Sequence, residues 1–174
     1  HPRTPGYPVA HPQKRHGTGS GNSGRGFHLR QKSLYLHRMA TKEGFTIEIS
    51  SRYEGWWRYN VALMCGCFDT AGNRTGFAST EAHVADVGSN LREKPAGNPG
   101  GGRASLETGP CDHLLLYIYI VPHTLPAGND IGDTTPFEVE IRIAYGGRRL
   151  RAEKRLINQW SGASIEMRVD SEAR

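Results

Sequence analysis

Apolar and polar residues alternate on both sides of a Gly-Gly pair near the C-terminal end of this chain. Phe137 to Tyr145 is apolar at nearly every second position, and the segment from Arg148 to Leu156 follows directly after Gly146-Gly147. A period of two puts alternate side chains on opposite faces of a strand. Two glycines tolerate the positive φ that a tight hairpin turn requires. The pattern therefore predicts an antiparallel β-hairpin.

The turn also predicts how the two strands of this hairpin pair. With Tyr145 opposite Arg148, the residues facing each other on the buried side would be Ile143–Leu150, Ile141–Ala152 and Phe137–Leu156. On the other face, Glu138 would lie opposite Arg155. This register predicts a buried Leu156.

Four further segments carry strand patterns, and they favour an all-β fold. They are Phe45–Ile49, Trp57–Cys67, Leu114–Val121 and Ile165–Val169. Leu114–Val121 is apolar on both faces, which predicts a central strand covered from both sides. It is also the longest apolar run, and it is too short for a membrane-spanning helix. We expect an antiparallel β-sandwich over residues 43–174, with a closed barrel as the alternative.

One segment interrupts the strand pattern. Ser79–Lys94 begins with residues that cap helices, has Glu81 early, and has Arg92 and Lys94 late. This charge order matches a helix dipole, although Gly88 weakens the pattern. We expect at most one short helix, and we place it here.

Residues 1–42 form a separate basic arm by composition. They hold eight Lys or Arg and no acidic residue, whereas the remainder has 14 basic and 17 acidic residues. Residues 1–26 are rich in Gly and Pro and have almost nothing to bury, which predicts disorder. Met39 is a plausible translation start. Any nucleic-acid binding would begin in this arm.

Three cysteines raise questions of pairing and of metal binding. Cys65 and Cys67 are too close along a strand to bridge each other, so a disulfide would join Cys111 to one of them. The low count favours a reducing compartment without fixing one. With His113 the three thiols also make a potential Cys₃His zinc set. We expect no metal, because the alternation places Cys65 and Cys67 on the core face and Cys111 and His113 on the opposite one.

Other chemistry is only weakly indicated. Asp130 and Asp133 could attract Ca²⁺, with help from Asp69 or Glu107, but their spacing matches no known calcium loop. Gly97–Arg103 resembles a phosphate-binding loop but lacks its Lys and Ser/Thr. The residue types that hydrolases use, Ser, His and Asp, occur separately along the chain and without a nucleophile motif. The candidate residues are Ser79, Ser105, His83, His113, His123 and Asp112.

Aromatic residues raise a carbohydrate-binding hypothesis, because sugars stack on exposed rings. The candidates are Trp56, Trp57, Tyr59 and Trp160. The alternation puts Trp57 and Tyr59 on the core face, where aromatic rings mostly pack. Trp56 follows Gly55 near a strand start, and we expect it to be the exposed one.

A basic cluster on the predicted hairpin is the nucleic-acid candidate within the domain. It consists of Arg148, Arg149 and Arg151, with Lys154 and Arg155 nearby. Glu138, Glu140 and Glu153 lie across from these residues or between them. A charge-balanced, solvated hairpin therefore explains the cluster better than a nucleic-acid surface does.

No motif is specific enough to carry a known family's function to this chain. Without a convincing catalytic set or cofactor motif, we expect a non-catalytic interaction or structural module with a protein or glycan partner. Its binding surfaces would be the loops 95–110 and 122–136, since long loops on a rigid sandwich commonly carry binding. The alternatives are a carbohydrate-binding module and a capsid-like subunit whose basic arm binds nucleic acid.

Overall fold

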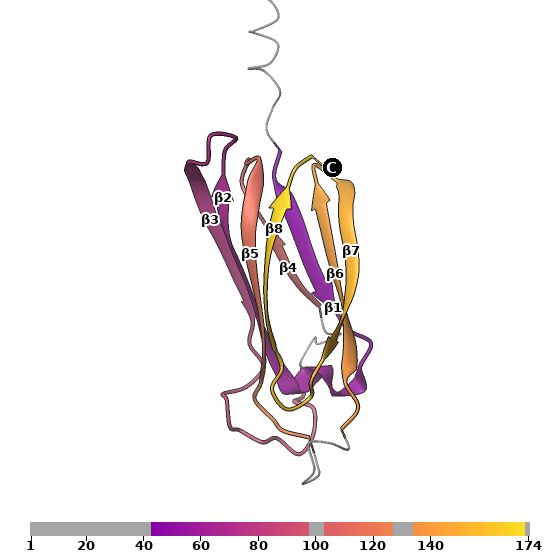
Figure 1. The fold of residues 1–174 in the computed structure, drawn as a ribbon. Helices are drawn as coiled ribbons and strands as arrows, with labels where there is room; N and C mark the ends of the chain where they lie inside the picture. The colour runs from indigo at the N-terminus through magenta and orange to yellow at the C-terminus, as the bar shows by residue number, and fades with distance from the viewer. Residues whose placement is uncertain (1–42, 98–102, 127–133, 173–174) are drawn as a thin grey trace, which may run out of the picture. The chain divides into compact units, whose positions relative to one another are not determined.

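The domain is a β-sandwich of two four-stranded antiparallel sheets, as the alternation predicted (Figure 1). The computed structural model describes residues 43–97, 103–126 and 134–172. Its elements are β1 (Phe45–Ser50), η1 (Glu54–Arg58), β2 (Tyr59–Phe68), β3 (Arg74–Ala82), β4 (Arg103–Glu107), β5 (His113–Pro122), β6 (Phe137–Tyr145), β7 (Arg148–Ile157) and β8 (Ala163–Asp170). The closed barrel is therefore excluded for this part of the chain.

The two sheets mix strands that are distant in sequence. The first sheet has the order β4-β1-β6-β7, and the second has the order β3-β2-β5-β8. β1 pairs with β4 on one side and with β6 on the other, so residues near 50, 103 and 140 become neighbours. β5 pairs with β2 and β8 and has the interior position expected of it. The first sheet thus places residues from three separate segments on one surface.

The core fills the space between the sheets with the alternate side chains of each strand. Burial follows the period of two in β1, where Phe45, Ile47 and Ile49 are buried, and in β6, where Phe137 to Ile143 alternate in the same way. β2 and β5 supply the facing layer. β5 is covered on one face only, because Leu115, Tyr117 and Tyr119 alternate with its buried residues and keep part of their surface exposed. The expectation that it is covered on both faces was wrong.

The register predicted for the β6–β7 hairpin was also wrong. Tyr145 does face Arg148, but the register shifts by one residue between Ile143 and Ala144. Ile143 therefore pairs with Arg151, and Phe137 pairs with Ile157. A bulge of this kind inserts an extra residue into one strand and reverses the faces beyond it.

The bulge turns a row of charged side chains of β7 toward the inner side of its sheet. Arg151, Glu153 and Arg155 lie opposite the buried residues of β6, and Leu156 is left 74% exposed. The charges pair with one another, with Arg155 Nε 2.9 Å from a Glu153 carboxylate oxygen. β7 is an edge strand, so these groups still reach water. Inward-facing charges at an edge hinder pairing with another chain.

The helix predicted for Ser79–Lys94 does not form. Ser79–Ala82 is the end of β3, and the chain then runs through turns with positive φ at Gly88 and Asn90. The side chain of Asn60 accepts hydrogen bonds from Val84 N at 2.7 Å and from Ala85 N at 3.3 Å. These bonds satisfy backbone donors that a helix would have used internally. No helix among the described residues is long and apolar enough to cross a membrane.

Candidate functional site

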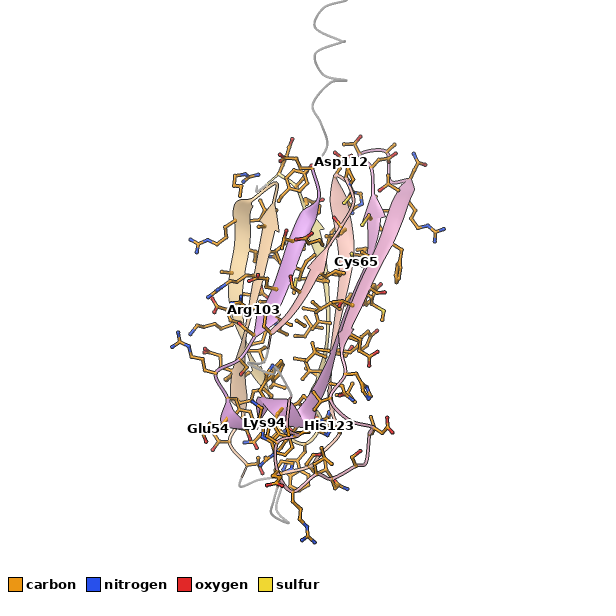
Figure 2. All side chains as sticks on the ribbon, turned by 180° about the vertical axis from the view of Figure 1, so that it is seen from behind. Glu54, Cys65, Lys94, Arg103, Asp112 and His123 are labelled. Carbon is orange, nitrogen blue, oxygen red and sulfur yellow. The ribbon has the colours of Figure 1, made fainter. Side chains whose placement is uncertain are left out.

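An open, charged hollow of about 890 Å³ lies on the outer side of the first sheet. It is formed where the end of β1, the start of β4 and the outward side chains of β6 and β7 meet the link to η1. Its lining residues are Ser50, Ser51, Arg52, Tyr53, Arg103, Phe137, Glu138, Glu140, Arg142 and Lys154. Arg103, labelled in Figure 2, begins β4 and lies directly across from Ser50 of β1.

The wall of the hollow between β1 and η1 is held by hydrogen bonds and ring packing. The Ser51 hydroxyl donates to the Glu138 carbonyl at 2.6 Å and accepts from Tyr53 N at 3.2 Å. The Tyr53 ring stacks on Phe137 with 4.5 Å between centroids, and its hydroxyl donates to Gln159 Oε1 at 2.7 Å. Such contacts fix the backbone of residues 51–53 against β6. The link between β1 and η1 is thus held in place against β6.

Two ion pairs occupy one side of the hollow. Arg142 holds Glu140 with two hydrogen bonds, Nε to Oε1 at 3.0 Å and Nη2 to Oε2 at 2.8 Å. Lys154 Nζ lies 2.7 Å from Glu138 Oε1. The hydrogen bonds from Arg142 lower the pKa of Glu140, and the positive charges of Lys154 and Arg52 act in the same direction. Both carboxylates therefore already have cationic partners.

Arg52 and Arg103 supply positive charge that these carboxylates do not match. Among residues 43–97, 103–126 and 134–172, neither guanidinium has a carboxylate within 4.0 Å. The hollow has four cationic and two anionic side chains in its lining, and Glu48 of β1 pairs with Arg142 in the strand register. The surplus is positive. A guanidinium group with no carboxylate close by can offer several N–H donors to an oxyanion such as a carboxylate, sulfate or phosphate.

Sequence reasoning missed this hollow. Arg103 was noted only as the residue after a glycine run, although it belongs to the segment 95–110 expected to bind. Arg52 lies in the short link between β1 and η1, and no sequence pattern around it indicated a binding role. The two line the same hollow because β1 pairs with both β4 and β6, a pairing that local patterns do not reveal.

The aromatic residues predicted to bind sugar do not form one exposed platform. Trp56 is only 6% exposed and packs in the core against Tyr59 and Phe137, so its expected exposure was wrong. Tyr59 is buried as expected, and its hydroxyl donates to the Gln159 carbonyl at 2.6 Å. Burial raises the pKa of this phenol. Neither ring is free to stack on a ligand.

The other predicted ligand-binding residues are dispersed. Trp57 is half-buried with the Arg58 guanidinium 5.6 Å from its ring centroid. Trp160, also half-buried, donates from Nε1 to Thr134 Oγ1 at 2.8 Å. Asp130 and Asp133 lie outside the described residues. Segment 95–110 is not a single loop, because Arg103–Glu107 is β4.

The structure shows a different aromatic surface on the outer face of the second sheet. Tyr117 and Tyr119 alternate outward along β5, with Met64 and Ala62 of β2 directly opposite. Phe77 of the neighbouring edge strand β3 is 66% exposed. The alternation within Leu114–Val121 was the signal for this surface.

The predicted basic cluster is divided between two faces of β7. Arg151 and Arg155 lie on the inner side with Glu153, whereas Lys154 lies on the outer side with Glu138. The Arg148 guanidinium donates to the Ser171 carbonyl at 3.0 Å. Arg149 is exposed beside the turn. Nucleic-acid binding by Arg148, Arg149 and Arg151 stays a prediction.

The residues considered for hydrolysis are not assembled into a catalytic set. His123 is buried, with Nε2 2.7 Å from the Trp57 carbonyl oxygen and Nδ1 2.8 Å from Thr124 Oγ1. His113 stacks on Phe68, and His83 lies near Glu81 and Asp86 at the end of β3. Ser79 and Ser105 face outward from different sheets. In the part of the chain that the structure describes, neither serine hydrogen-bonds to a histidine.

The described residues hold no group of three or more His, Cys, Asp or Glu arranged to bind a metal ion. Of the residues considered for calcium, Asp69 accepts hydrogen bonds from Asn73 N at 2.8 Å and from Asn73 Nδ2 at 3.1 Å, which close the β2–β3 turn. Glu107 ends β4 opposite Thr46 of β1.

Comparisons with known proteins give a distant likeness of fold. No protein-family model and no curated protein matches the chain. A solved structure of a DUF4425 family protein from Bacteroides ovatus is 9% identical with a TM-score of 0.35, covering 74% of this chain and 94% of that one. A DUF4425 domain of unknown function from Bacteroides vulgatus is 11% identical with a TM-score of 0.36, covering 74% and 93%. At so low a similarity, nothing about the function of this chain follows.

Proposed function

We propose that this domain is a non-catalytic interaction module that binds an anionic group of its partner in the hollow beside β1 and β4. The observation that carries the proposal is the pair Arg52 and Arg103, two guanidinium groups with no carboxylate within 4.0 Å in the described part of the chain, beside Arg142 and Lys154, which have carboxylate partners. An oxyanion at this place receives charge-assisted hydrogen bonds without breaking an existing ion pair. Because the site is open to water, binding weakens as salt is added.

The domain boundaries belong to the same proposal. Residues 43–174 form the binding domain, and residues 1–42 are the basic arm, which lies outside the described residues. The capsid-like alternative depends on that arm. It predicts assembly with nucleic acid, and no contact among the described residues favours it over the hollow.

The test is a calorimetric titration of the full chain with a panel of anionic probes: sulfate, inorganic phosphate, glucuronate and a sulfated oligosaccharide. We expect at least one to bind, and the double variant Arg52→Ala/Arg103→Ala to lower its affinity at least tenfold. Arg149→Ala is the matched control, because it removes an exposed arginine of the same sheet beside the hairpin turn.

Two outcomes would overturn the proposal. One is the absence of binding for every anionic probe at millimolar concentration. The other is binding that the double variant leaves unchanged. Binding of a neutral oligosaccharide that survives the double variant and is lost in Tyr117→Ala would instead favour the carbohydrate-binding alternative, on the outer face of the second sheet.

A further inference from the structure

Three buried thiols gather in one part of the sandwich. Cys65 and Cys67 point into the core from β2, and Cys111 lies just before β5, with exposed fractions of 0%, 2% and 0%. All three are unbridged in this structure. Figure 2 places Cys65 and the neighbour of Cys111, Asp112, in the same half of the domain. The expectation that Cys111 faces away from Cys65 and Cys67 was wrong, because Cys111 precedes the strand and does not follow its alternation.

Hydrogen bonds on both sides fix the position of Cys111. Its backbone N–H donates to the Glu43 carbonyl at 3.2 Å, and the next residue, Asp112, donates to the Phe68 carbonyl at 2.8 Å. The Asp112 carbonyl accepts from Ser171 N at 2.8 Å. The hydroxyl of Thr108 lies 3.8 Å from the Cys111 sulfur. The segment that carries Cys111 is therefore tied to three neighbouring parts of the fold.

The strand register selects Cys67 rather than Cys65 as the neighbour of Cys111. Cys67 lies opposite Leu114 and Cys65 opposite Leu116, so Cys67 is two residues closer to the start of β5. The Asp112–Phe68 bond joins the residues that directly follow Cys111 and Cys67. The Cys67 and Cys111 thiols are close enough to shift each other's pKa, and Cys65 also affects the pKa of Cys67. Cys65 and Cys67, two apart on one extended strand, are poorly placed to bridge.

We propose that Cys67 and Cys111 form a disulfide when this chain folds in the presence of a small-molecule disulfide such as oxidised glutathione. The thiolate of one cysteine attacks a glutathione sulfur, forms a mixed disulfide and releases one glutathione thiolate. The second cysteine, as thiolate, attacks the protein sulfur of that mixed disulfide and releases the second glutathione. Two protein thiols are oxidised, one glutathione disulfide is reduced, and the two thiol protons pass to the leaving thiolates. Cys65 stays a free, buried thiol.

The bond forms during folding because the folded core protects the thiols. Burial raises the pKa of Cys111 to about 11 and also raises that of Cys67, so neither is a thiolate at neutral pH in the folded state. The bond closes a loop from residue 67 to residue 111. A loop of roughly this length constrains the unfolded chain enough to raise the melting temperature by about 10 °C.

The test refolds the full chain with a reduced and oxidised glutathione mixture and then alkylates it in denaturant. We expect one alkylated cysteine, Cys65, and a non-reduced peptide that joins Cys67 to Cys111 by mass spectrometry. Cys65→Ala is the matched control and should keep the bond. Cys67→Ala should leave Cys65 and Cys111 without a bridge.

Three alkylated cysteines in the refolded wild-type chain would overturn the proposal, and so would a bond that includes Cys65 or a mixture of bridges. Because the peptide map is made on the wild-type chain, the result does not depend on whether a variant folds. The melting temperature of the bridged form, compared with that of the reduced form, measures the stabilisation.

Discussion

Asn60 and His123 are buried polar side chains at the end of the sandwich that carries η1, and each fixes a neighbouring loop. Asn60 binds the backbone of Val84 and Ala85 after β3. Because the Trp57 carbonyl can only accept, His123 Nε2 carries the proton and donates to it. Nδ1 lies 2.8 Å from the hydroxyl oxygen of Thr124, and that oxygen accepts from Leu91 N at 3.0 Å. Buried polar groups of this kind are costly to leave unpaired.

His123→Ala should therefore lower the free energy of unfolding by about 2–4 kcal/mol, since it leaves a cavity and two unpaired polar groups. His83→Ala is the control. Its side chain is 52% exposed, and we expect a change within about 0.5 kcal/mol. Urea unfolding of both variants measures the difference. Equal, small effects would contradict the structural role given to His123.

β7 shows how a single element can depart from its sequence pattern. Leu150, Ala152 and Leu156 had the alternation of a buried face, but the bulge at Leu150 leaves that residue partly buried against the core and turns Ala152 and Leu156 outward. The sequence signal for the turn was correct, and Tyr145 faces Arg148 as predicted. The bulge was not predictable, because its cause lies in the packing of the edge strand and not in the hairpin's own alternation.

Two adjacent serine substitutions distinguish the observed register from the expected one. Leu156→Ser should change stability by no more than about 0.5 kcal/mol, because Leu156 is 74% exposed. Ile157→Ser should cost about 3 kcal/mol or more, because Ile157 is 2% exposed and a buried hydroxyl adds to the lost packing. Thermal unfolding of the two variants measures both losses of stability. A larger loss for Leu156→Ser than for Ile157→Ser would support the register expected from the sequence.

At the scale of the whole molecule, the fold was predictable and the hollow was not. Alternating segments such as Phe45–Ile49 and Ile165–Val169 indicated half-buried antiparallel strands, and these strands form the two sheets. The order β4-β1-β6-β7 is set by packing between segments that lie far apart in sequence, such as Phe45 and Tyr145, and no local pattern encodes it. That strand order creates the hollow, so the sequence alone did not indicate that Arg52 and Arg103 line one site.

The most direct test of the account is a chemical-shift map of the ¹⁵N-labelled full chain during titration with each probe of the anionic panel. We expect saturable shifts in the amides of the residues that line the hollow: Ser50–Tyr53, Arg103, Glu138, Glu140 and Arg142. These shifts should disappear in the Arg52→Ala/Arg103→Ala variant. Saturable shifts confined to other residues, such as Tyr117 and Tyr119 on the opposite sheet, or no saturable shifts at all, would contradict the proposed site.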